Sequence, residues 1–137
     1  MIGEERELLR HYGIDRGQIL YTAQFDVAED YRFTDGYILL TERQLAVLLY
    51  VPKQGESYQF GGYGGRQSTH KDEKPAIQLF SLADIEYLDI IRELTGGVLY
   101  GKVKGIEIRL CRFTNSHMGE MERLKNNLQK VKAGDTL

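Results

Sequence analysis

The side chains that could carry nucleophilic or metal chemistry are few and far apart in this sequence. There is one cysteine, Cys111, and there are three histidines, His11, His70 and His117. A cysteine nucleophile needs a base within hydrogen-bond reach, but Cys111 is expected inside a strand and His117 at the start of a helix. No two histidines have the spacing of metal ligands, and no second cysteine is present. We therefore expect a non-enzymatic protein without a metal or other cofactor, and a structural Cys111.

Acidic side chains gather in an expected first hairpin, at Asp26, Glu29 and Asp30. General acid or base catalysis needs a carboxyl group whose pKa is raised by apolar surroundings, and a polar turn offers none. We interpret these carboxylates as solvated surface charges.

A glycine-rich stretch, residues 53–74, contains side chains typical of a partner-binding loop: Tyr58, Phe60, Tyr63 and Arg66. Aromatic and arginine side chains on a flexible backbone often form binding hot spots. The stretch has almost no aliphatic residue, so a disordered insertion is the other interpretation. A phosphate-binding loop is disfavoured because a strand, rather than a helix, is predicted to follow.

The last third of the chain is basic although the whole chain has a net charge of −2. Residues 98–132 hold eight basic and three acidic residues. Two interpretations stay open: the acidic and basic parts attract each other within one fold, or the basic side chains contact a partner or an anionic membrane. The candidate contact residues are Lys102, Lys104, Arg123 and Lys125, with Lys130 and Lys132 added for a membrane.

Most of the elements that must position these side chains are predicted strands. A short helix is predicted over 4–12, followed by three strands within 19–51. The second contains a bend at Asp35-Gly36 and an apolar run that needs cover on both faces. The glycine-rich loop at 53–74 comes next, and strands four to seven lie within 76–113. Two hairpin turns are predicted there, at Gly96-Gly97 and at Lys104-Gly105.

The chain then changes to a helical period over 116–132. Apolar residues recur at steps of three and four and form one stripe: Met118, Met121, Leu124, Leu128 and Val131. Seven antiparallel strands followed by one amphipathic helix predict a mainly β domain, with a bent sheet or partly open barrel that the helix caps. This order is typical of pleckstrin-homology-like domains; another small barrel or an α+β roll is the alternative.

Length and composition fit this expectation. The chain has 137 residues, of which 42% are hydrophobic and 28% charged, as in a single globular domain. There is no apolar run long enough to span a membrane, and the first residues are too charged for a signal peptide. With its lone cysteine, the sequence predicts a cytoplasmic protein. The net charge gives no reason to expect nucleic-acid binding.

Four stretches resemble a known bacterial module: residues 35–48, 80–85, 96–99 and 111–116. They are similar to the cytosolic N-terminal region of bacterial ABC exporter subunits that fuse a permease with an ATPase. The resemblance implies a domain without catalytic residues that precedes membrane helices and an ATPase, and this chain contains neither. It implies an accessory or excised domain, with transporter subunits as partners at the inner face of the membrane.

These observations predict a non-catalytic interaction or regulatory module that binds a protein segment. Pleckstrin-like folds bind extended peptides at a sheet edge or beside the C-terminal helix by adding a strand. The alternative is association with an anionic membrane surface through the basic last third. The acidic first hairpin disfavours phosphorylated lipid headgroups. A homodimer through an exposed sheet edge is compatible with both.

Overall fold

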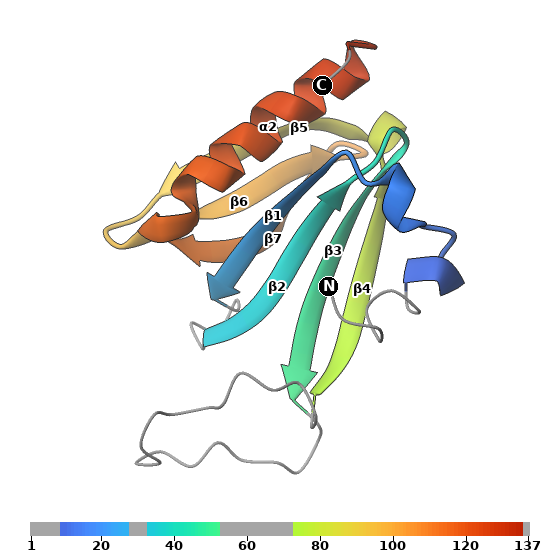
Figure 1. The fold of residues 1–137 in the computed structure, drawn as a ribbon. Coiled ribbons are helices and arrows are strands. Elements are labelled where there is room, and N and C mark those ends of the chain that lie inside the picture. Colours follow the sequence, from blue (N-terminus) through green and yellow to red (C-terminus); the bar gives the residue numbers. More distant parts are fainter. Residues whose placement is uncertain (1–8, 28–32, 53–72, 136–137) are drawn as a thin grey trace.

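The computed structural model describes residues 9–27, 33–52 and 73–135, without the side chains of 33–34, 50–52 and 73–75. Seven antiparallel strands form one sheet in the order β4-β3-β2-β1-β7-β6-β5, and one long helix follows them (Figure 1). The elements are β1 Tyr21–Val27, β2 Phe33–Leu40, β3 Gln44–Pro52, β4 Glu73–Ser81, β5 Ile85–Arg92, β6 Gly96–Val103, β7 Ile106–Thr114 and α2 Met118–Lys132. The predicted mainly β fold with a closing C-terminal helix is confirmed.

The sheet is divided into two halves at β1 and β7, whose pairing is limited to Val27 opposite Arg112 in the described residues. Every other neighbouring pair of strands is joined over five or more residue pairs. β4 and β5 lie at the two ends of the strand order, so the sheet is open rather than a closed barrel. α2 lies across the junction of the two halves, against β1 and β5 and away from β4 (Figure 1).

The stripe of α2 forms one wall of the main core. Met121, Leu124 and Leu128 are fully buried, and Met118 and Val131 pack at the margin of the same cluster. The strands contribute inward-facing side chains such as Phe25, Ile38, Leu45, Leu88 and Leu99. The helix therefore closes the core as its apolar period predicts.

A second, smaller cluster covers the opposite face of β2 and β3. Leu9 and Ile14, from the segment before β1, pack on Leu39 and Ala46, with Ile77 and Leu79 of β4 at the margin. This segment is helical at residues 9–11 and contains a 3-10 turn, η1, at Arg16–Gln18. Cover on both faces of the apolar run in β2 is thus confirmed. Residues 4–8 of the predicted first helix lie outside the described residues.

The predicted hairpin turn at Gly96-Gly97 is wrong, because both glycines belong to β6. The turn is formed by Leu94 and Thr95, closed by a 2.8 Å bond from Glu93 N–H to the Gly96 carbonyl. A Cβ at Gly96 would overlap the Phe113 carbonyl, so this glycine is needed for close strand packing rather than for turning. The second predicted turn is confirmed: Lys104 and Gly105 have φ of 51° and 80°.

Several predicted boundaries also shift. β4 begins at Glu73, within the stretch predicted as the 53–74 loop, and β3 continues through Pro52, which pairs with Glu73. Residues 53–72 lie outside the described residues. A fifth strand predicted over 85–94 is shorter in the structure, because β5 ends at Arg92. The C-terminal helix is α-helical only from Met118, because residues Asn115–His117 form a 3-10 turn, η3.

Candidate interaction site at the strand edges

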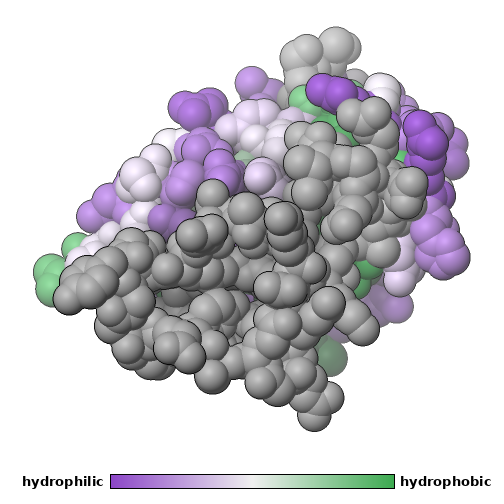
Figure 2. All heavy atoms as spheres, turned by 60° about the horizontal axis from the view of Figure 1, so that its bottom comes forward, coloured by the Kyte–Doolittle hydropathy of each residue, from purple (hydrophilic) through white to green (hydrophobic). Residues whose placement is uncertain are grey.

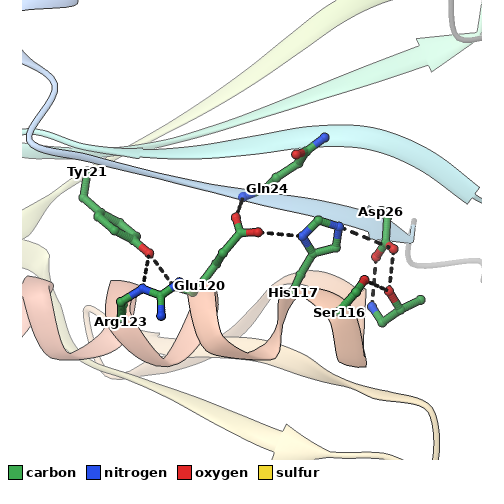
Figure 3. Close-up of polar contacts among 8 residues, drawn as sticks. Tyr21, Gln24, Asp26, Ser116, His117, Glu120 and Arg123 are labelled. Atoms are coloured by element: carbon green, nitrogen blue, oxygen red, sulfur yellow. Dashed lines mark hydrogen bonds and ion pairs between the residues drawn. The ribbon is translucent and has the colours of Figure 1, made fainter.

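The exposed backbone of β1 is covered by α2 where β7 does not pair with it. The Gln24 N–H donates to Glu120 Oε2 at 2.9 Å, and the Tyr21 hydroxyl donates to the Glu120 carbonyl oxygen at 3.1 Å. Arg123 Nε donates to the same hydroxyl at 3.3 Å (Figure 3). Along this edge, side chains of α2 and β1 thus form hydrogen bonds where a neighbouring strand would otherwise pair with β1.

His117 lies between two carboxylates at the start of α2. Its Nδ1 is 2.9 Å from Glu120 Oε1, and its Nε2 is 3.7 Å from Asp26 Oδ2 (Figure 3). Asp26 also accepts the Thr114 N–H at 2.9 Å and the Thr114 hydroxyl at 2.6 Å. This polar group fastens η3 and the first turn of α2 to the end of β1.

The interpretation of Asp26 as a solvated turn residue is therefore wrong, since its side chain is only 26% exposed. A bulge of β2 lies opposite Asp26. Between the pairs Phe25–Gly36 and Val27–Phe33, Asp26 alone faces both Thr34 and Asp35. The bulge coincides with the predicted bend at Asp35-Gly36. Glu29 and Asp30 lie outside the described residues.

The outer edge of β5 is partly closed by its own side chain. The Glu93 N–H points to β6, so by alternation the Ile90 N–H points away from the sheet. It donates to Asp89 Oδ1 at 2.8 Å. β5 also carries Glu86 and Arg92, and its pairing with β6 shifts register between Ile85 and Tyr87. Charges and bulges are common means of preventing a further strand from pairing.

Polar side chains of α2 close the rest of this edge. Lys132 Nζ donates to the carbonyl oxygen of Leu82 at 3.1 Å and also to that of Ile85. Lys125 Nζ is 3.6 Å from Asp89 Oδ1. At the far end of β5, Arg92 Nη2 donates to Glu122 Oε1 at 3.1 Å. These contacts place side chains of α2 at both ends and in the middle of β5 and occupy the Ile85 carbonyl, which disfavours the addition of a strand beside the helix.

The charge of Asp89 is stabilised at this position. The Ile90 N–H and, more weakly, Lys125 hold the pKa of its carboxyl group below the ordinary value of 3.8, although partial burial opposes them. Tyr100 donates to Asp89 Oδ2 at 3.3 Å. Desolvation, followed by the charge of Asp89, raises the pKa of the Tyr100 phenol, which favours the protonated donor form.

The outer edge of β4 is different. The Leu82 N–H donates to the Arg43 carbonyl at 2.9 Å, towards β3. By alternation, the N–H groups of Ile77, Leu79 and Ser81 point away from β3, as does the nitrogen of Pro75. Pro75 carries no N–H, and such a residue is tolerated where it faces an open edge. In the described residues, these outward groups have no hydrogen bond. We call them the β4 edge.

The predicted basic residues do not form one surface. Lys104 Nζ is 3.7 Å from Asp84 Oδ2, at the β6–β7 turn, whereas Arg123 and Lys125 contact opposite neighbours of α2, β1 and β5. Lys102 is half-buried on β6. Lys104 and Lys125 meet acidic side chains, which agrees with attraction within one fold, whereas Arg123 and Lys132 bond to a hydroxyl group and to carbonyl oxygens. Tyr58, Phe60, Tyr63 and Arg66 lie outside the described residues.

The described surface offers no large apolar patch as an alternative site. The exposed large hydrophobic residues belong to different elements: Tyr12, Leu20, Ile91, Leu94 and Ile106. Figure 2 shows one face on which the coloured surface is mostly hydrophilic and green areas are small. Single exposed hydrophobic residues are normal in soluble proteins.

Chemical clusters are equally sparse. Across residues 9–27, 33–52 and 73–135, no three His, Cys, Asp or Glu side chains are grouped so as to hold a metal ion. Cys111 is buried in the main core, and the ring nitrogens of His117 face Glu120 and Asp26. No helix within these ranges has the length and apolarity to cross a membrane.

The sequence predicted a sheet edge as a site without indicating β4, and the polar group around His117 was not predicted. Pro75 between β-forming residues was the one available signal for an edge strand. Among known proteins, no family model and no curated protein matches this chain.

Proposed function

We propose that this chain is a non-catalytic interaction module that binds an extended protein segment by adding it as a strand to the β4 edge. One observation carries this proposal. Of the two ends of the strand order, β5 is partly closed by Asp89 and by side chains of α2, whereas the outward backbone groups of β4 from Pro75 to Ser81 have no partner in the described residues. Main-chain bonds to such an edge provide affinity for an extended segment.

The composition of β4 supports the same edge. The two charged residues of β4, Glu73 and Lys74, lie at its start, and from Pro75 to Ser81 the strand has none. Its pairing with β3 has no register shift. β5, by contrast, has three charged residues and an irregularity. A long, regular, uncharged edge favours pairing with another chain.

The resemblance to the N-terminal region of ABC exporter subunits supports a narrower form of the proposal. In that form, the bound segment belongs to a transport system, and the chain is its accessory domain. The membrane-surface alternative gains no support from the basic residues, which are dispersed and largely paired.

The experiment compares capture of proteins by the wild-type chain with capture by Ser81→Pro and Ser81→Ala. Ser81 has φ −71°, which proline adopts without strain, and its exposed side chain and outward N–H are not needed by β3. Ser81→Pro therefore removes one donor of the β4 edge while the fold is kept, and Ser81→Ala retains that donor.

Incubated with solubilised membranes of the source organism, wild type and Ser81→Ala should retain the same protein, identified by mass spectrometry. Ser81→Pro should lose it. Equal retention by Ser81→Pro would overturn strand addition at β4. Retained proteins with neither membrane helices nor an ATPase would overturn the transport part of the proposal.

A further inference from the structure

We infer that a second copy of this chain is a partner for the β4 edge, and that two β4 strands pair antiparallel about a twofold axis at Gln78. This inference rests on the proposed strand-accepting role of β4. Symmetric pairing of two identical edges extends each sheet by the other and closes both edges at once.

The alternation along β4 determines which groups would bond. Outward N–H and carbonyl groups belong to Ile77 and Leu79, so Ile77 of one copy would exchange two hydrogen bonds with Leu79 of the other. The symmetric exchange adds two more. The Ser81 N–H of each copy would then donate to the Pro75 carbonyl of the other, for about six bonds in all.

Pro75 favours this register over a shift by one residue toward Glu73. With the axis at Gln78, each Pro75 lies opposite Ser81 at the end of the paired stretch, where its missing N–H costs least. With the axis at Ile77, Pro75 would lie opposite Leu79, and two central bonds would be lost.

The side chains agree with the same register. Ile77 and Leu79 both belong to the small outer cluster, and the axis at Gln78 places them opposite each other across the copies. On the other face, exposed Ala76 would meet Phe80, which packs at the margin of the main core. Apolar cross-strand pairs stabilise a sheet. With the axis at Leu79, Ile77 would face Ser81 and Phe80 would face Gln78.

Charge also fits a second copy. Antiparallel self-pairing places like residues near the axis opposite each other, so a charge there would repel itself. No charged residue lies between Pro75 and Ser81, and exposed, neutral Gln78 lies on the axis. At this position the two strands approach closely because Gln78 would form a pair without backbone hydrogen bonds.

Sedimentation equilibrium tests the inference with Gln78→Lys and Gln78→Glu, alone and mixed. Wild type should move from monomer at about 1 µM towards dimer at about 1 mM, as expected for a small interface. Each variant alone should weaken association roughly fivefold, because like charges then face each other. Mixing the two variants should restore it.

Control variants test whether weaker association results from a charge at position 78 itself, from added charge anywhere on the surface, or from loss of the folded state. Asn126→Lys adds the same charge to an exposed site on α2 and should associate like wild type. Ser81→Pro should weaken association roughly tenfold, whereas Ser81→Ala should not change it. Circular dichroism verifies that each variant is folded.

A wild-type chain that stays monomeric at every concentration would overturn the inference, as would a dimer indifferent to both Gln78 variants. Variants that weaken association without rescue on mixing would overturn the Gln78 register. If the chain is monomeric while Ser81→Pro still abolishes capture of a partner, only the self-pairing is wrong. If Ser81→Pro affects neither assay, the strand-accepting role of β4 is wrong as well.

Discussion

Glu120 is the side chain through which α2 meets the unpaired backbone of β1. It accepts the Gln24 N–H and faces His117, and its side chain is 32% exposed. Glu120→Ala should lower the free energy of unfolding by about 1–3 kcal/mol, because the half-buried N–H loses its acceptor. Glu120→Gln keeps an acceptor oxygen and should lower the free energy of unfolding by less than Glu120→Ala does.

Urea denaturation measures the free energy of unfolding of the Glu120 variants, with Glu122→Ala as the matched control. Glu122 lies on the same helix and its side chain is 34% exposed, but its contacts in the described residues are with the side chains of Arg92 and Lys125 and not with a backbone N–H. Glu122→Ala should lower the free energy of unfolding by less than about 1 kcal/mol. Equal losses for Glu120→Ala and Glu122→Ala would contradict the role given to Glu120.

Asp89 should make stability depend on pH in one direction. Its pKa is lowered in the folded state, so the carboxylate stabilises the protein above 3.8, and this contribution is lost as pH falls through the folded-state pKa. Asp89→Asn resembles the protonated group and still accepts the Ile90 N–H. Wild type should be more stable than Asp89→Asn at pH 7, and their urea midpoints should converge below pH 3.8. A constant difference down to pH 2 would argue against this account.

At the scale of elements, the glycines of β6 show how a residue can be needed for strand packing rather than for a turn. Gly96→Ala should destabilise the protein by at least about 2 kcal/mol, because the added Cβ collides with the Phe113 carbonyl. Gly17→Ala, where no atom lies within 4 Å of the added Cβ, should change stability by less than about 1 kcal/mol. Thermal unfolding of the two variants tests this role, and the melting temperature of Gly96→Ala should be clearly lower than that of Gly17→Ala. Similar melting temperatures would contradict the packing role of Gly96.

The elements themselves were largely predictable from periodicity. Alternation at Tyr21, Ala23 and Phe25 and the three-four spacing in α2 are local patterns, and both correctly predicted which faces are buried. Gly96 was misassigned because its role depends on Phe113, which follows much later in the chain. The closing of β5 by Lys125 and Lys132 could not be predicted either, since it depends on where α2 lies against a distant strand.

At the scale of the molecule, the position of α2 determines which edges stay available. The helix covers the unpaired stretch of β1 through Glu120 and the β5 edge through Lys125 and Lys132. It lies away from β4 (Figure 1), where the segment before β1 packs on side chains of the outer face through Leu9 and Ile14. In the described residues, the fold thus presents a regular strand edge that is uncharged from Pro75 to Ser81.

The most direct measurement of this account is residue-resolved amide hydrogen exchange by NMR as the protein concentration is raised. In dilute solution, Ile77 and Leu79 should exchange rapidly, whereas Gln78 and Phe80, which donate to β3, should be protected. At high concentration, Ile77 and Leu79 should become protected while Ile90 on β5 does not change. Slow exchange at Ile77 and Leu79 already in dilute solution, or new protection at the β5 edge instead, would contradict the assignment of β4 as the strand-accepting edge. Rapid exchange at Ile77 and Leu79 that does not change with concentration would contradict the pairing of two β4 strands.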